Sequence, residues 1–233
     1  MKNKLEKSTQ TISQLRVAIA SVDAVLFAVV DGMVYTLLVP VHRPPFYVHM
    51  HGLPGGVIGP DEDATESATR HLKEKAGVTQ VHIEQLYTFS APERDKRSRS
   101  ISIAYMALVS PDQFSAIAEK TGGKWFPVKM LPTLAYDHKD IIAMGLERLQ
   151  GKLAYTNIVA HLLPEHFTLT ELQHMYETIL ERKFDKRNFR KKMVSIGLVK
   201  EVGKKKKTIH KPAELYSFVK KDLTVIPEIR SAL

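Results

Sequence analysis

Residues 55–78 combine glycines, carboxylates and cations in an order that suits phosphate chemistry. The order is Gly56, Glu62, Arg70, Glu74 and Gly77, with five, seven, three and two residues between successive members. Carboxylates on a helix can hold divalent cations that polarise a phosphate and activate water. A helix with Glu and Lys on its outer face is often only a solvated helix, but the matched spacing of two glycines, Glu62, Arg70 and Glu74 favours a functional motif over coincidence.

The spacing resembles the Nudix box, whose pattern is G-x5-E-x7-R-E-U-x-E-E-x-G-U with U apolar. His71 and Lys75 stand where the family has glutamates, and only Glu74 matches a metal-binding glutamate of the family. Histidine is a poor magnesium ligand, and a lysine ammonium repels a cation. In the family, the position of Glu62 supports the fold more than it carries metals. We therefore expect no catalytic residue, no metal site and no required cofactor. Magnesium would matter only if hydrolase activity survives.

The box can still bind an anion where its metal-binding glutamates have been replaced. Gly55 and Gly56 precede the helix and can present backbone N–H groups to an anionic ligand. Lys75 can supply the positive charge that a cation would otherwise bring, although an ordinary surface lysine is an equally good interpretation. With the retained Arg70 and Glu74, these residues form our candidate ligand site.

Local signals predict the helix that positions these side chains. Asp63 and Glu66 form a capping box, so a helix is expected at about Ala64–Ala76, with Gly77 as its stop. Leu53–Gly56 is expected to be a turn.

Strands and helices alternate around the box. Asp31-Gly32 is a two-residue hairpin signal between two β-rich runs. Alternation and helical spacing predict strands at Val17–Val30, Met33–Val41, Val81–Phe89, Ser100–Val109 and Lys124–Val128, and a helix at Asp140–Leu153. The fold class is therefore an α/β Nudix-like sandwich, with a mixed sheet between helices. His42, His49 and His51 lack a fixed ligand spacing and are interpreted as ordinary loop histidines.

The net charge of +9 is concentrated in the last third of the chain. Residues 152–233 contain 17 Lys and Arg against 9 Asp and Glu, whereas residues 1–151 contain 17 against 16. Such an excess indicates an anionic polymer or surface as the partner of that region. A merely soluble lysine-rich tail is the alternative.

The arrangement of these charges favours DNA. Thr168 and Glu171 cap one helix, and Asp185 begins a second that stops at Gly197, as in a helix-turn-helix. Strands at Leu198–Val202 and Leu215–Val219 then enclose a basic loop and complete a small α+β winged-helix domain. The expected DNA-binding residues are Lys186, Arg187, Asn188, Arg190 and Lys191 on the second helix and Lys204, Lys205, Lys206 and Lys207 in the wing.

A degenerate Nudix domain followed by a winged helix resembles the NrtR-like family of Nudix-related transcriptional regulators. The resemblance extends over about residues 17–218 and includes Gly52–Gly56, Glu93–Arg97, Ala135–His138, Phe167–Gln173, Lys186–Lys192 and Pro212–Tyr216. It implies a homodimeric repressor that binds double-stranded operator DNA and senses a metabolite, often ADP-ribose; a sister branch responds to the pentose arabinose. It also implies Arg94 and Arg97 as ligand contacts. Relatives commonly carry a basic residue and a tryptophan in place of Val41 and His51.

We expect four segments: a flexible tail over 1–14, a Nudix-like ligand-sensing domain over 15–151, a winged helix-turn-helix over 152–222, and a C-terminal tail over 223–233. The absence of cysteine excludes disulfides and thiolate metal sites and fits a cytoplasmic location. No signal peptide or membrane partner is expected, because no apolar run is long enough.

The same residues are also compatible with two other functions. One is a Nudix hydrolase of ADP-ribose or a related nucleoside diphosphate. The other is an RNA-binding Nudix protein that uses the same basic surface.

Overall fold

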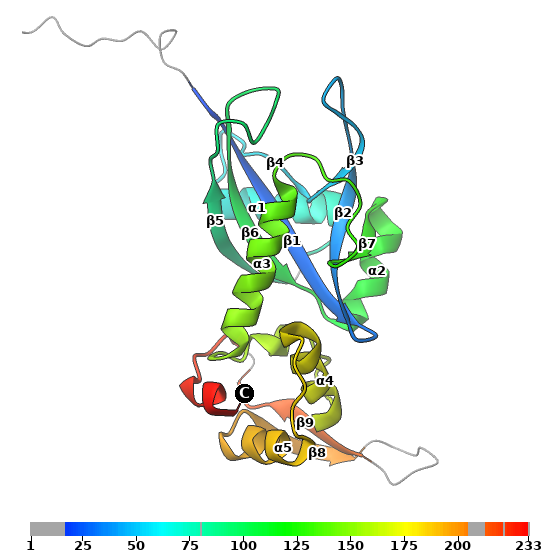
Figure 1. Cartoon of the computed structure of the whole chain (residues 1–233), viewed down its shortest axis with the longest axis vertical. Coiled ribbons are helices and arrows are strands. Elements are labelled where there is room, and N and C mark those ends of the chain that lie inside the picture. The colour runs from blue at the N-terminus through cyan, green and yellow to red at the C-terminus, as the bar shows by residue number, and fades with distance from the viewer. Residues whose placement is uncertain (1–16, 80, 205–212, 221, 233) are drawn as a thin grey trace, which may run out of the picture.

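Two packed domains make up the computed structural model, which describes residues 17–79, 81–204, 213–220 and 222–232 (Figure 1). The upper domain is a sheet with helices on both faces, and the lower one contains two helices and a two-stranded sheet. The predicted tail over 1–14 and the predicted DNA contacts Lys205, Lys206 and Lys207 lie outside the described residues.

The central strand of the upper sheet is β1 (Ile19–Val30). It continues antiparallel into β2 (Met33–Arg43) through the predicted Asp31-Gly32 turn, where φ is 48° and 71°. Both residues are left-handed, as a two-residue hairpin loop requires. On its other side β1 pairs in parallel with β6 (Ser100–Leu108), which pairs antiparallel with β5 (His82–Phe89). The sheet is therefore mixed, as expected.

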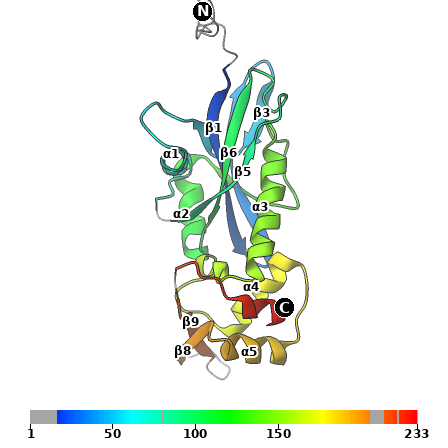
Figure 2. The same cartoon turned by 90° about the vertical axis from the view of Figure 1, so that its left-hand side faces the viewer.

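Helices cover both faces of this sheet because β1 is apolar on both of its sides. Val25, Phe27 and Val29 pack toward α3 (His138–Leu153). The alternate residues, among them Leu26, pack toward α1 (Ala64–Ala76) and α2 (Pro111–Thr121) on the opposite face (Figure 2). The predicted α/β sandwich is thereby confirmed.

The turn expected at Leu53–Gly56 is shorter than predicted: Leu53 and Pro54 connect two strands, whereas Gly55 and Gly56 lie in the sheet. β3 (Tyr47–Gly52) and β7 (Lys124–Pro127) pair with β2, and β4 (Gly55–Val57) pairs with β1 at Asp23 and Val22. The glycine pair therefore lies well before α1 and not at a helix start. The histidines interpreted as loop residues also lie in strands, His42 in β2 and His49 and His51 in β3. The short strands β3 and β4 depend on tertiary pairing that local sequence does not show. The strand predicted at Lys124–Val128 is present as β7, and α2 was not predicted.

The lower domain follows its predicted elements closely. α4 (Leu169–Leu180) has the Thr168–Glu171 capping box, and Asp185 accepts the backbone N–H of Asn188 at 2.8 Å to begin α5 (Lys186–Ser195). β8 (Val199–Lys204) and β9 (Glu214–Phe218) form the predicted antiparallel wing.

The chain end is packed, which corrects the expectation of a tail over 223–233. Ile226 donates its N–H to the Tyr155 carbonyl at 2.7 Å, and η3 (Pro227–Ala232) places the fully buried Ile229 in the main apolar cluster. Apolar residues at this spacing gain free energy by leaving water, which explains the docking. Within the described ranges, no helix is both long and apolar enough to cross a membrane.

One apolar cluster runs from the sheet face under α3 through η2 (Ile158–His161) into the lower domain, where it includes Phe189 of α5. Gln150 of α3 donates to the Ile179 carbonyl near the end of α4 at 2.9 Å. Gly32 of the β1–β2 turn lies so close to His174 of α4 that a Cβ there would meet its Nε2 at 3.0 Å. The two domains are thus packed directly against each other.

His161 at this junction makes stability sensitive to acid. Its ring stacks on His82 with centroids 4.5 Å apart, and burial followed by repulsion from His82 lowers the pKa of His161 from 6.5 to about 4, against opposing attraction from Asp222 and Glu84. Between these two values the unfolded chain binds a proton that the folded chain does not, so stability falls as pH falls through this window.

We expect the urea midpoint of the wild type to decrease between pH 6.5 and pH 4.5, and that of His161→Phe to decrease less, because phenylalanine retains a stacking ring without the titrating nitrogens. The exposed His166→Phe is the matched control and should keep the wild-type profile. An unchanged profile in His161→Phe would contradict the assignment.

Candidate functional site

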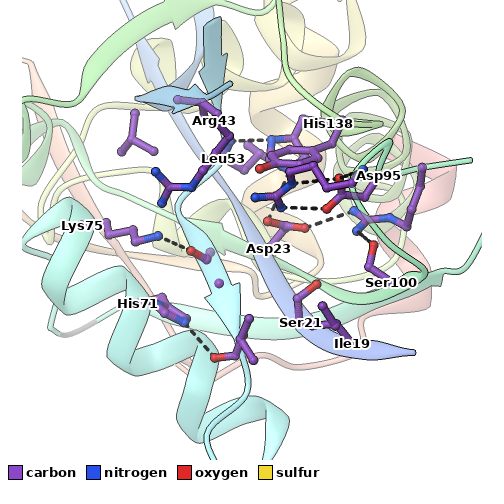
Figure 3. Close-up of a pocket in the computed structure, with 18 of the residues that line it drawn as sticks. Ile19, Ser21, Asp23, Arg43, Leu53, His71, Lys75, Asp95, Ser100 and His138 are labelled. Carbon is purple, nitrogen blue, oxygen red and sulfur yellow. Dashed lines mark hydrogen bonds and ion pairs between the residues drawn. The ribbon is translucent and has the colours of Figure 1, made fainter. Parts of the chain in front are cut away.

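A cavity of about 550 Å³ opens between the start of β1, the end of β2, β4, α1 and the loop before β6 (Figure 3). Its volume lies in the range of small-molecule binding sites. Carboxylates form its floor, a tyrosine and an arginine form one wall, and the box helix forms the other.

The floor is built around Asp23, a buried carboxylate in β1. It accepts the Ser102 hydroxyl at 2.6 Å and Arg94 Nη2 at 3.3 Å, and His138 Nε2 lies 3.3 Å away. Burial alone would raise the pKa of Asp23, but His138, Ser102 and Arg94 together hold it below its ordinary value. His138 is fixed in turn, because its Nδ1 accepts the Leu53 N–H at 2.8 Å.

Arg94 lines the cavity but is fully engaged by the protein. Its Nε and Nη2 bind the two oxygens of Asp137 at 2.9 and 2.7 Å, and its Nη1 donates to Ser100 at 3.2 Å. With Asp23 as a further partner, every guanidinium nitrogen has an acceptor. Arg94 therefore supports the floor rather than offering free donors to a ligand.

Arg97 and Tyr136 form the first wall. Arg97 is held by Asp95 at 3.0 and 2.7 Å and lies 5.3 Å from the Tyr136 ring centroid, within cation–π range. Tyr47 packs behind Tyr136 with 4.3 Å between ring centroids. Tyr136 has φ 56°, an unusual backbone conformation for a bulky residue that such packing must hold in place.

The second wall is formed by β4 and by α1, the helix that carries the Nudix-box residues Arg70 to Lys75. Lys75 Nζ donates to the Gly55 carbonyl, and His71 Nε2 lies 3.3 Å from the Val57 carbonyl (Figure 3). Burial is the largest cause that lowers the pKa of both side chains. Gly56 has to be a glycine here, because a Cβ would lie 2.6 Å from the His71 ring.

Five of the seven predicted ligand-site residues are brought together in the cavity lining: Gly55, Gly56, Lys75, Arg94 and Arg97. Arg70 and Glu74 do not line it. Arg70 binds Glu62 at 2.5 and 2.8 Å and Glu74 at 3.3 Å, so it clamps the preceding loop to α1.

Among the cavity residues that sequence reasoning missed are the charged and aromatic side chains of Asp23, Arg43, Tyr136 and His138. Asp23 did give a signal, since it interrupts an otherwise apolar strand, and a buried charge is retained only with partners.

The donor set does not fit the magnesium that a Nudix box implies. A magnesium site needs several oxygen ligands. Here Glu62 is bound to Arg70 and to the Gly59 N–H, while His71 and Lys75 present an imidazole and an ammonium. Across the described part of the chain, no three His, Asp or Glu side chains are grouped to hold a metal.

The exposed face of α5 is basic. Lys186, Arg187, Asn188 and Lys191 are exposed, whereas Arg190 is half-buried with Nη2 2.5 Å from the Thr170 hydroxyl of α4. Arg190, expected as a DNA contact, thus also bridges the two helices. Lys204 lies at the end of β8, in the wing.

Comparisons with known proteins agree with this architecture. The NUDIX domain family model matches residues 20–144, and that of the NrtR DNA-binding winged helix domain matches residues 159–218. An ADPR responsive transcriptional repressor from Acinetobacter baylyi is 32% identical over 207 residues, which cover 87% of this chain and 82% of that protein.

Two solved structures extend the likeness. The crystal structure of Shewanella oneidensis NrtR complexed with a 27mer DNA is 34% identical, with a TM-score of 0.76, over 91% of this chain and 95% of that one. The NUDIX domain of the same protein, complexed with ADP ribose, is 34% identical with a TM-score of 0.51 and covers 60% of this chain and 94% of its own. The chain therefore belongs to the NrtR family of transcriptional regulators, in which a Nudix domain is joined to a DNA-binding winged helix.

Proposed function

We propose that this chain is a transcriptional repressor that binds ADP-ribose in its Nudix cavity and couples that binding to its affinity for operator duplex. One observation carries the proposal: the cavity joins an aromatic face, Tyr136, to the cations Arg43, Lys75 and Arg97. Both carboxylates that line it, Asp23 and Asp95, already accept bonds from protein donors.

This combination suits a nucleoside diphosphate sugar. Aromatic rings stack on bases, and cations bind phosphate oxygens through charge-assisted hydrogen bonds. A related Nudix domain was crystallised with ADP ribose, and a related full chain with DNA, which supports both halves of the proposal. We further propose a homodimer, since two copies can read two half-sites of a palindromic operator.

Helix α3 supplies a physical connection between the two sites. It begins at His138 in the cavity floor and spans 16 residues, about 24 Å at 1.5 Å per residue. Its last turns contact α4 through Gln150. A ligand that shifts the His138 end can therefore displace the helix-turn-helix at the other end.

The test starts from a duplex selected from a randomised library, whose affinity is measured by fluorescence polarisation with and without ADP-ribose. We expect ADP-ribose to change duplex affinity by about fivefold or more, and duplex to change ADP-ribose affinity by the same factor. We also expect ADP-ribose to raise the melting temperature. AMP and arabinose serve as comparison ligands.

Three outcomes would contradict the proposal. Stabilisation by arabinose but not by ADP-ribose would reassign the effector to a pentose. Tighter binding to single-stranded RNA than to duplex at one salt concentration would favour the RNA-binding alternative. Magnesium-dependent release of AMP that disappears in Glu74→Gln would favour a hydrolase.

A further inference from the structure

We propose that the Lys75 ammonium replaces the divalent cation of the Nudix site, so that the cavity binds a diphosphate without metal. This inference rests on the proposed function, in which the ligand carries a diphosphate. It arises from the mismatch between the magnesium that the box implies and the side chains that occupy it.

Lys75 lies where a cation can act on a ligand. It projects from α1 into the cavity lining, is partly buried, and donates to a neutral acceptor, the Gly55 carbonyl (Figure 3). An ammonium has three N–H donors, so two remain for phosphate oxygens. Among the described residues, no carboxylate oxygen lies within ion-pair distance of its Nζ.

The surroundings of Lys75 favour an incoming anion. Burial and repulsion by Arg43 and Arg70 disfavour the charged form of Lys75, while Asp23 and Glu74 favour it only through longer-range attraction. Arg43 also lines the cavity, and its own bond is to the adjacent His42 carbonyl at 3.0 Å. Two cations that line the same cavity and are each bonded to a neutral carbonyl gain Coulomb energy when a diphosphate arrives.

The residual carboxylates of the box cannot restore a metal site beside this lysine. Glu74 is 54% exposed and binds Arg70 at 3.3 Å, and Glu62 binds the same arginine at 2.5 Å. A magnesium ion placed in the cavity would instead meet the Lys75 ammonium and be repelled.

The experiment is calorimetric titration of the full chain with ADP-ribose, in EDTA and in magnesium. We expect wild-type affinity to agree within about twofold between the two buffers. Lys75→Met should lose about tenfold in affinity in both. Lys75→Glu, which restores the family residue, should lose binding in EDTA and regain part of it with magnesium. Lys73→Glu is the matched control, with the same charge change on an exposed position of the same helix, and should behave as wild type.

Each failure points to a different conclusion. Wild-type binding only in magnesium would overturn metal-free recognition and leave ADP-ribose as the effector. Undiminished binding by Lys75→Met, with an unchanged melting temperature, would overturn the role of Lys75. No binding of ADP-ribose by the wild type in either buffer would overturn the proposed function and, with it, this inference.

Discussion

Replacing Arg187 and Lys191 together with alanine is expected to lower affinity for the selected duplex by at least about 100-fold. Both side chains are exposed on α5, the helix that a winged helix lays in the major groove. A good base contact contributes about 1–3 kcal/mol and each tenfold in affinity is about 1.4 kcal/mol. Fluorescence polarisation at several salt concentrations measures the loss. A plot of log affinity against log salt has a negative slope, and the magnitude of that slope should fall by about 0.9 for each phosphate contact removed.

The matched control removes two exposed cations from the upper domain, Lys73 and Lys139. This double alanine variant has the same net charge as the α5 variant, so any effect of overall charge appears in both. Equal losses in the two variants would show that binding follows total charge and not the α5 surface.

The second large effect is expected from Arg94→Met, which should reduce the free energy of unfolding by about 3–5 kcal/mol. The substitution leaves Asp23 and Asp137, whose side chains are 11% and 14% exposed, without their shared cation. Asp23 keeps Ser102 and His138, but both carboxylates lose a counter-charge in a buried site, which is costly, and methionine replaces only the volume of the arginine stem. Urea unfolding followed by circular dichroism measures the change.

Arg97→Met provides the comparison for this variant. Arg97 makes a similar bond to Asp95, but its own side chain is 38% exposed, and the buried Asp95 keeps the Arg97 backbone N–H at 3.0 Å as a partner. We therefore expect a smaller loss of about 1–2 kcal/mol. If Arg94→Met were no more destabilising than Arg97→Met, the buried cluster would not support the cavity floor as we infer.

Elements with local signals were predictable from the sequence. Asp63, Glu66 and Gly77 define both ends of α1, Asp31-Gly32 defines the hairpin, and Asp185 begins α5. Each signal acts over four residues or fewer, because capping and turn hydrogen bonds form within that distance.

The cavity floor was not predictable in the same way. Arg94 meets Asp23 across 71 residues of sequence and Asp137 across 43, so neither pairing leaves a local pattern. The bond between Arg190 and Thr170 was not predictable for a related reason, since Thr170 lies on a different helix. The predicted wing contacts at Lys204–Lys207 stay predictions.

The apolar cluster at the domain junction has a thermodynamic consequence. Ile158, Leu162 and Phe167 occupy the connection between the domains and are fully buried there, where a flexible linker would be solvated. Opening the lower domain alone would expose these side chains at about 25 cal/mol per Å² of apolar surface. We therefore expect the two domains to unfold in one cooperative transition. Free energy gained when the cavity is filled also stabilises the helices that meet DNA.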